Sequence, residues 1–266
     1  TINGGYQSIY NDGSAVSTTI NSGGRQYVSS GGSATSTTIN HWGLMLVSSG
    51  GSATSTIINS GGELGVYDGS ATDITVNDNG ILSVVDGGSA VNVTQDSGGV
   101  INANTSATLS GINPNGSFSI AGGSANNMLL ENGGGLYVYS GHQATNTTIN
   151  NSGTMNIVSG GSATNTTINN GGVQSAYGGS TLNTTINNGG VQFVYVGGSA
   201  ADTTINSGGT QRVSDSGNAT KTVINSGGLQ DVGYRGSVSD TTINSGGGQY
   251  VSNGGSVTNT TINTGG

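Results

Sequence analysis

Residues 23–40 of this chain read GGRQYVSSGGSATSTTIN, and variants of this phrase follow one another along the whole sequence. The residue next to the end of the phrase, Ile39 in this copy, is used here as an anchor that aligns the copies. The fifteen anchor positions are Ile2, Ile20, Ile39, Ile58, Val76, Gln95, Ile112, Leu130, Ile149, Ile168, Ile186, Ile205, Ile224, Ile243 and Ile262. Successive anchors lie 17 to 19 residues apart. A unit this short cannot enclose a core alone, so the pattern predicts a repeat architecture in which neighbouring units stack.

Five positions of the phrase change little between copies and are predicted to face inward, because a buried position accepts few side chains. In the second copy they are Gln26, Val28, Ala34, Thr37 and Ile39. The Val28 position is apolar throughout: Ile9, Val28, Val47, Val66, Val84, Ala103, Ile120, Val138, Ile157, Ala176, Val194, Val213, Val232 and Val251.

The spacing of two residues between Gln26 and Val28, and between Thr37 and Ile39, is the alternation of β-strands. Gly-Gly pairs between them permit turns, while Gly, Asn, Thr and Ser disfavour helices. The sequence therefore predicts an all-β fold, a single-stranded parallel β-helix (β-solenoid) of about 14 coils of 18–19 residues, continuous over residues 1–266. We expect it to be right-handed, as parallel crossover connections usually are.

The middle of the chain departs from the phrase. At the Gln26 position the central copies carry apolar residues, namely Met45, Leu64, Leu82, Ile101, Phe118, Leu136 and Met155. Gln95 replaces the anchor isoleucine, the single interval of 17 residues follows it, and the one proline, Pro114, occupies a corner. We expect an irregular coil or a bend near residues 93–118.

Composition excludes several functional classes. The 52 glycines lack a tripeptide period, so the chain is not collagen-like. A net charge of -8, with Arg25, Arg212, Lys221 and Arg235 as the only Lys and Arg residues, disfavours nucleic acid and anionic lipid as partners. There is no cysteine for disulfides or thiolate metal sites. No apolar run of about 18 residues occurs, so we expect no membrane insertion of this segment.

Residues suited to catalysis are scarce. Charged residues make up 6% of the chain, and the only two histidines, His41 and His142, lie about five coils apart. Hydrolytic sites need grouped ionisable side chains, and no Ser-His-Asp set can be assembled. We therefore predict that the chain is not an enzyme and uses no cofactor or catalytic metal.

Two surface patterns leave alternatives open. Six of the twelve acidic residues lie between Glu63 and Asp96, with Asp68 and Asp86 in the same position one coil apart. A solvated acidic patch is the favoured interpretation, with calcium as the alternative, although the known calcium repeat is absent. An outward row of threonines beside the anchor raises ice binding as a minor alternative, but the row is interrupted by Ile57 and other residues.

Serine recurs at two turn positions that are candidate sugar acceptors. The position before the small inward residue is serine in twelve of fourteen copies, and the first group of candidates taken from it is Ser33, Ser52, Ser89, Ser162, Ser199 and Ser256. The second group occupies a corner after the anchor and comprises Ser22, Ser60, Ser97, Ser207, Ser226 and Ser245. A serine that only bonds a turn amide explains any single position equally well.

The phrase from Gly24 to Asn40 resembles the repeat of self-associating autotransporter adhesins of the AIDA type, and the resemblance covers nearly the whole chain. The stretch Ser106 to Asn150, which contains LSGIN at 109–113 and LENGG at 130–134, also resembles a junction segment of that family. The resemblance implies a secreted passenger on the surface of a Gram-negative bacterium. Since both ends interrupt the phrase, we expect a segment of a longer protein. The resemblance implies that an outer-membrane barrel outside this sequence anchors it.

In that family, passengers mediate bacterial aggregation, biofilm formation and adhesion to host cells. Several members carry heptose on serine, added by a dedicated cytoplasmic glycosyltransferase. The resemblance therefore implies three partners: a second copy of the chain on another cell, the host-cell surface and a heptosyltransferase. The alternative is a structural stalk that displays another domain and has no adhesion of its own.

Overall fold

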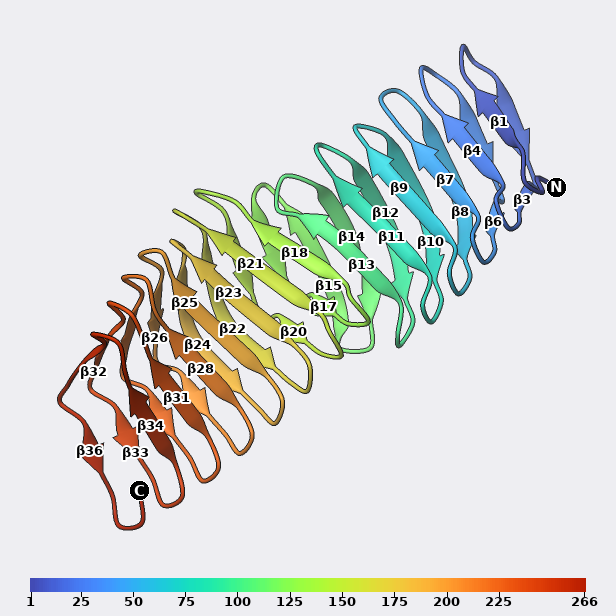
Figure 1. The fold of residues 1–266 in the computed structure, drawn as a ribbon. Helices are drawn as coiled ribbons and strands as arrows, with labels where there is room; N and C mark the ends of the chain where they lie inside the picture. Colours follow the sequence, from blue (N-terminus) through green and yellow to red (C-terminus); the bar gives the residue numbers. More distant parts are fainter. The chain divides into compact units, whose positions relative to one another are not determined.

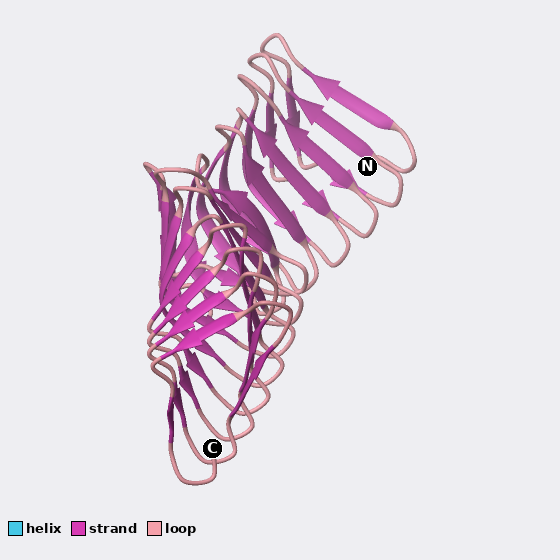
Figure 2. Ribbon diagram, turned by 60° about the vertical axis from the view of Figure 1, so that its left-hand side comes forward, coloured by secondary structure: helices cyan, strands magenta, loops and turns pink.

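The chain is entirely β in the computed structural model, which describes all 266 residues and contains strands and loops but no helix (Figures 1 and 2). No helix of the length and apolarity needed to cross a membrane is therefore present. The strands pair in parallel from coil to coil, which confirms the predicted β-solenoid of about 14 coils. The chain divides into two compact units, Thr1–Gly134 and Gly135–Gly266.

Each unit consists of a front sheet, whose strands carry the Gln26 and Val28 positions, and a back sheet, whose strands carry the Ala34 and Ile39 positions. In unit 1 the front strands are β1 (Tyr6–Ile9), β4 (Arg25–Val28), β7 (Leu44–Val47), β9 (Glu63–Tyr67), β11 (Ile81–Val85) and β13 (Val100–Asn104). Its back strands are β2 (Ser14–Val16), β3 (Thr19–Ile20), β5 (Ser33–Thr35), β6 (Thr38–Ile39), β8 (Ser52–Ile58), β10 (Ser70–Val76), β12 (Ser89–Gln95), β14 (Thr108–Asn113), β15 (Gly116–Ala121), β16 (Ser124–Asn126) and β17 (Leu129–Leu130).

Unit 2 repeats the arrangement. Its front strands are β18 (Gly135–Val138), β21 (Thr154–Val158), β23 (Val173–Tyr177), β25 (Val191–Tyr195), β28 (Thr210–Val213), β31 (Leu229–Val232) and β34 (Gly248–Val251). Its back strands are β19 (Gln143–Thr145), β20 (Thr148–Ile149), β22 (Ser162–Ile168), β24 (Ser180–Ile186), β26 (Ser199–Ala201), β27 (Thr204–Ile205), β29 (Asn218–Thr220), β30 (Val223–Ile224), β32 (Ser237–Ser239), β33 (Thr242–Ile243), β35 (Ser256–Thr258) and β36 (Thr261–Ile262).

The five predicted inward positions are confirmed in the second copy, where Gln26, Val28, Ala34, Thr37 and Ile39 are all buried. In the last copy the prediction was wrong for Val251 and Ile262, which are 50% and 64% exposed. Between Ala34 and Thr37 the back sheet bends at a residue with left-handed backbone, Ser36 in this copy (φ 57). Other copies place Asp, Asn or Ser there, and one places Lys221 (φ 53). Asp and Asn are among the non-glycine residues that tolerate this conformation best. The bend lets both halves of the back strand turn their apolar side inward.

Rows of identical amides link the coils. In the core of unit 2, Gln192 Nε2 donates to Gln174 Oε1 at 2.7 Å, Gln211 donates to Gln192 at 2.7 Å and Gln230 to Gln211 at 2.6 Å. A second row at the corner after the anchor continues through Asn206, whose Nδ2 donates to Asn187 Oδ1 at 2.8 Å. Buried amides paired in this way cost little, because each donor and acceptor keeps a partner.

The regular register ends at β14. Ala90 pairs with Leu109 and Val93 with Gly111, so one residue is skipped. Ile112, predicted as an inward anchor, instead pairs with the outward Thr94 and is 55% exposed, while Asn113 takes the inward place. The prediction for Ile112 was wrong because the shortened interval removes a residue within the strand.

A reversed strand follows. The chain turns at Pro114, where Asn113 Oδ1 accepts a hydrogen bond from the Asn115 amide at 2.8 Å, and β15 then pairs antiparallel with both β14 and β16. Phe118 and Ile120 were assigned to the front-sheet positions of Gln26 and Val28. Both are buried, but they lie in the back sheet, so those two assignments were wrong.

The polar anchor Gln95 belongs to this irregular region. Its Nε2 donates to the backbone carbonyls of Gly99 at 2.8 Å and Leu129 at 3.1 Å. Leu129 begins β17, a strand that follows the reversed strand β15 in the chain. An amide at this anchor therefore supplies hydrogen bonds that an isoleucine could not.

Ile57 and Ile58 provide a test of the inward assignment within a single strand. Ile58 is fully buried and Ile57 is 44% exposed. Ile58→Asp should lower the free energy of unfolding by about 3 to 5 kcal/mol, since it removes apolar packing and buries an unpaired charge. Ile57→Asp should change it by less than about 1 kcal/mol. Chemical denaturation of both variants checks this, and similar losses would contradict the assigned faces.

The glutamine row gives a second prediction. Gln211 exchanges hydrogen bonds with Gln192, Thr203, Gln230 and Thr222. Gln211→Leu should cost about 2 to 4 kcal/mol, because these buried groups lose their partners.

The matched control is Gln26→Leu, at a position bonded only to Gln7 and Thr37. It should cost about half as much as Gln211→Leu, measured by denaturant unfolding. Equal costs would mean that side-chain shape, rather than amide pairing, decides the stability of this row.

Candidate functional site

The corner after the anchor presents one side chain of each coil to solvent. In the copy around Ser226, the Gly228 amide donates to the Asn225 carbonyl at 2.8 Å, and Gly227 has a positive φ of 74°. This is the geometry of a type II turn with glycine at its third position, so Ser226 occupies the second position. The hydroxyl of Ser226 therefore projects from the corner.

The next coil leaves room for that hydroxyl. A Cβ atom at Gly246 would lie only 2.7 Å from Ser226 Oγ, so glycine is required there if the serine is to keep its position. The Gly227 amide also donates to the Gly246 carbonyl at 2.8 Å, which holds the two corners at the spacing of neighbouring strands, about 4.8 Å. In unit 2, corner serines thus form a regular column.

The structure separates the two groups of candidate serines. All members of the corner group are exposed: Ser22, Ser60, Ser97, Ser207, Ser226 and Ser245. In the other group Ser33, Ser52, Ser89, Ser162 and Ser199 are half-buried at the start of back strands, and Ser256 is exposed in a terminal coil. A modifying enzyme therefore reaches the corner group more easily.

Ser97 has different surroundings from the other corner serines. The adjacent Gly98 amide donates to Glu131 Oε1 at 2.6 Å, and Asn132 Nδ2 donates to the Gly98 carbonyl at 3.0 Å. Side chains that follow the reversed strand thus bond this corner, while the Gly98 carbonyl still accepts the backbone hydrogen bond from Asn79 of the preceding coil at 2.9 Å. Its serine remains exposed.

A third group of exposed serines was not singled out from the sequence. Ser17, Ser36 and Ser55 occupy the left-handed bend of the back sheet, with φ between 55° and 57°. The sequence does contain a signal for this bend, because other copies carry asparagine or aspartate at the same position, and these residues tolerate positive φ.

Two acidic residues of unit 1 accept hydrogen bonds from asparagines of the next coil. Asp86 Oδ1 accepts a hydrogen bond from Asn104 Nδ2 at 3.4 Å, and Asp73 accepts one from Asn92. No group of three or more His, Asp or Glu side chains is placed to hold a metal ion. The two histidines lie in different units, His41 in unit 1 and His142 in unit 2.

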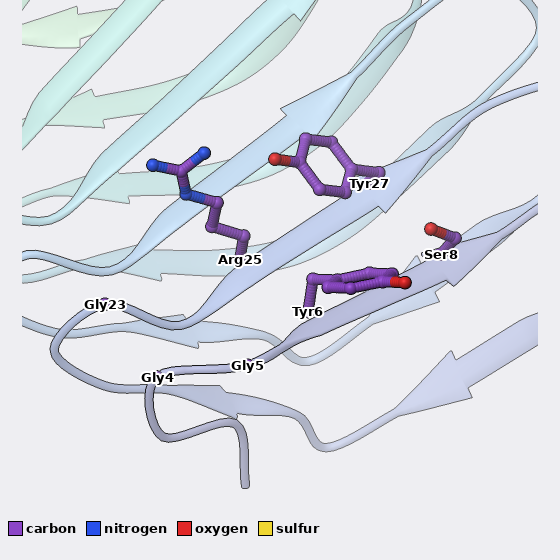
Figure 3. Close-up of a pocket in the computed structure, with 7 residues that line it drawn as sticks. All are labelled: Gly4, Gly5, Tyr6, Ser8, Gly23, Arg25 and Tyr27. Carbon is purple, nitrogen blue, oxygen red and sulfur yellow. The ribbon is translucent and has the colours of Figure 1, made fainter.

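The outer face of the front sheet is richer in aromatic residues than the serine and threonine pattern had indicated. In unit 1 an open hollow of about 560 Å³ is bordered by Tyr6, Ser8, Arg25 and Tyr27. Figure 3 shows the two tyrosines on neighbouring strands, with the Arg25 guanidinium group on the side of the Tyr27 hydroxyl. The hollow offers contact surface but no grouped acid, base and nucleophile.

The front sheet of unit 2 also carries aromatic rings and an arginine on its outer face. The rings of Tyr177 and Tyr195 meet edge to face at 5.2 Å, and the Arg212 guanidinium lies 5.7 Å from the Phe193 ring centre. Such groups give broad contact surfaces with few rotatable bonds, which suits binding. These residues could not be predicted from the repeat pattern, because tyrosine occurs at several outward positions without a fixed period.

Comparisons with known proteins agree with these observations. A family model described as "Adhesin of bacterial autotransporter system, probable stalk" matches residues 2–43, 11–62, 110–172 and 175–228. A solved structure, described as the TibC-catalysed hyper-glycosylated TibA55-350 fragment, has 45% sequence identity and a TM-score of 0.62. The similarity covers 98% of this chain and 95% of that one. No curated protein sequence matches the chain significantly.

Proposed function

The chain belongs to the family of bacterial autotransporter adhesins, as the repeat phrase indicated, and from this premise we propose that it is a cell-surface passenger segment that binds other surfaces and accepts sugar on its corner serines. The column of exposed serines on type II turns is the observation that carries the second part. The similar TibA fragment is described as hyper-glycosylated by TibC, which supports the same modification here.

The proposed modification is O-heptosylation by a cytoplasmic heptosyltransferase, with Ser22, Ser60, Ser97, Ser207, Ser226 and Ser245 as the preferred acceptors. Their hydroxyls are exposed and the backbone around Ser226 recurs from coil to coil, so one enzyme site could act on many copies. The half-buried group around Ser33 and Ser199 is proposed as a poorer set of acceptors, because its hydroxyls lie within the strand ladder.

The proposed adhesive activity is homotypic contact between cells, with aggregation and biofilm formation as its results, together with adhesion to host cells. Its support is the repetition of exposed hydroxyls and aromatic rings, since many weak contacts in parallel produce strong attachment. We propose that the segment acts by binding rather than by catalysis. We further propose that an outer-membrane barrel outside this sequence anchors it at the surface.

A stalk that displays another domain is the second candidate function. One observation favours it, namely that the matching family model is described as a probable stalk. The two functions differ in one measurable respect. An adhesin segment fused to a membrane anchor makes bacteria settle from suspension, whereas a stalk shown alone does not.

The acceptor assignment predicts a defined set of modified peptides. After co-expression with a heptosyltransferase, peptide mass spectrometry should find heptose on the peptide containing Ser226, and Ser226→Ala should remove it. Ser199→Ala serves as the control and should leave the number of heptoses unchanged, since Ser199 is half-buried. Modification confined to the half-buried group would contradict the assignment.

The charge predicts how clumping depends on salt. A net charge of -8 repels a second copy, so settling of displaying cells should accelerate as the screening length falls from about 30 Å in dilute salt to about 8 Å at physiological salt. Changing the six acids between Glu63 and Asp96 to Asn or Gln should weaken this dependence. An unchanged dependence would exclude that patch from the contact surface.

A further inference from the structure

One corner of unit 1 breaks the serine-glycine pattern. Where most copies carry glycine with a positive φ, this copy carries Trp42, with φ 58 and 69% of its surface exposed. A bulky residue in this conformation costs roughly 1 to 2 kcal/mol, and exposure returns little packing in exchange. Strain without a structural benefit points to function.

The tryptophan is held by its neighbour. The His41 ring meets the Trp42 ring edge to face, at 5.0 Å between centroids. His41 Nδ1 also lies 3.3 Å from the Ser60 carbonyl of the next coil. A Cβ atom at Gly61 would collide with Nδ1, so the glycine of the next corner makes room for the imidazole. The pair is therefore a placed aromatic platform.

A hollow of about 340 Å³ lies beside this platform, bordered by His41, Trp42, Leu44, Glu63 and Ile81. Leu44, Glu63 and Ile81 stand in one outward row, since Leu44 pairs with Glu63 and Glu63 with Ile81. The row places one carboxylate between two aliphatic side chains. The volume is near the lower limit of small-ligand sites, about 300 Å³.

We propose that this hollow binds a neutral pyranose unit of a glycan. A pyranose ring has an apolar C–H face, which matches the indole and the aliphatic side chains, and hydroxyl groups, which match a carboxylate and an imidazole as hydrogen-bond partners. No Lys or Arg borders the hollow, and the net charge is -8, so anionic sugars are disfavoured.

This inference deepens the proposed adhesive function, on which it rests, by naming a ligand class at one site. It differs from self-association because the occupant is a small polar ring that needs the Glu63 carboxylate. A second copy of the chain needs only apolar contact with Trp42. The two occupants therefore respond differently to loss of the carboxylate.

Trp42 is the single tryptophan of the chain, so its fluorescence reports on this site alone. Residues 1–266 would be titrated with the methyl glycosides of glucose, galactose, mannose and N-acetylglucosamine, and with sialyllactose as the anionic probe. We expect a saturable change with at least one neutral glycoside at millimolar concentration, and a weaker response to sialyllactose. No saturable change with any neutral glycoside overturns the proposal.

Variants test the assigned residues by saturation-transfer NMR, which does not need the indole. Trp42→Gly restores the residue found in most copies and should abolish binding while keeping or raising the melting temperature. Glu63→Gln should weaken binding about tenfold, since it removes a charge-assisted hydrogen bond. Tyr137→Ser, an exposed aromatic of unit 2, is the control and should bind like the parent. Unchanged binding by Trp42→Gly overturns the proposal.

Two results separate this proposal from the function on which it rests. Fluorescence that changes with protein concentration in the absence of sugar identifies a second copy as the occupant and overturns the glycan assignment. Settling of cells that display Trp42→Gly measures homotypic adhesion independently. Normal settling with lost glycoside binding supports a separate sugar site, and lost settling with retained glycoside binding overturns the assignment of Trp42.

Discussion

Each coil depends on the parallel hydrogen bonds that its backbone makes to the coils before and after it. Because these strands pair in register, a side chain lies over its equivalent one coil away, as Thr19 lies over Thr38. Each side chain must therefore pack favourably against the side chain at the same position of the next coil, about 4.8 Å away. Aliphatic side chains, amides and hydroxyls meet this condition, whereas like charges repel. The constraint explains why only 6% of the residues are charged.

Two kinds of core satisfy this condition, and the structure shows how they join. Glutamine rows require an amide above and below, whereas Leu64 and Met45 require only apolar contact. Inward threonines bond every glutamine of the unit 2 row, and at each junction the threonine remains as a partner on the side where the neighbouring amide is missing. Gln174, which follows Met155, donates to Thr166 Oγ1 at 3.0 Å, and Gln26, which precedes Met45, accepts from Thr37 at 3.4 Å. Inward threonine therefore lets one backbone carry both cores.

The sequence predicted the regular coils because periodicity carries the information that register needs. Val28 and Ile39 were assigned inward from their recurrence alone, and both are buried. Ile112 and Phe118 were misplaced for a physical reason. Ile112 faces outward because the strand lacks one residue relative to its neighbour. Phe118 is buried as expected, but an apolar residue does not say in which sheet or direction its strand runs, and the proline turn changed both. The aromatic outer face was missed because outward positions have no fixed residue type.

Outward positions are therefore where single copies can differ without disturbing the ladder. A serine on a type II corner recurs because the turn recurs, so its number grows with the number of coils and its exposure is similar at each. The His41–Trp42 corner occurs once and accepts a strained backbone that the fold itself does not require. Repeated corners suit contact whose strength comes from number. A unique corner suits a contact whose strength comes from its particular side chains. One chain can carry repeated corners and a unique corner, because the inward residues that set the register do not determine which residues stand at the corners.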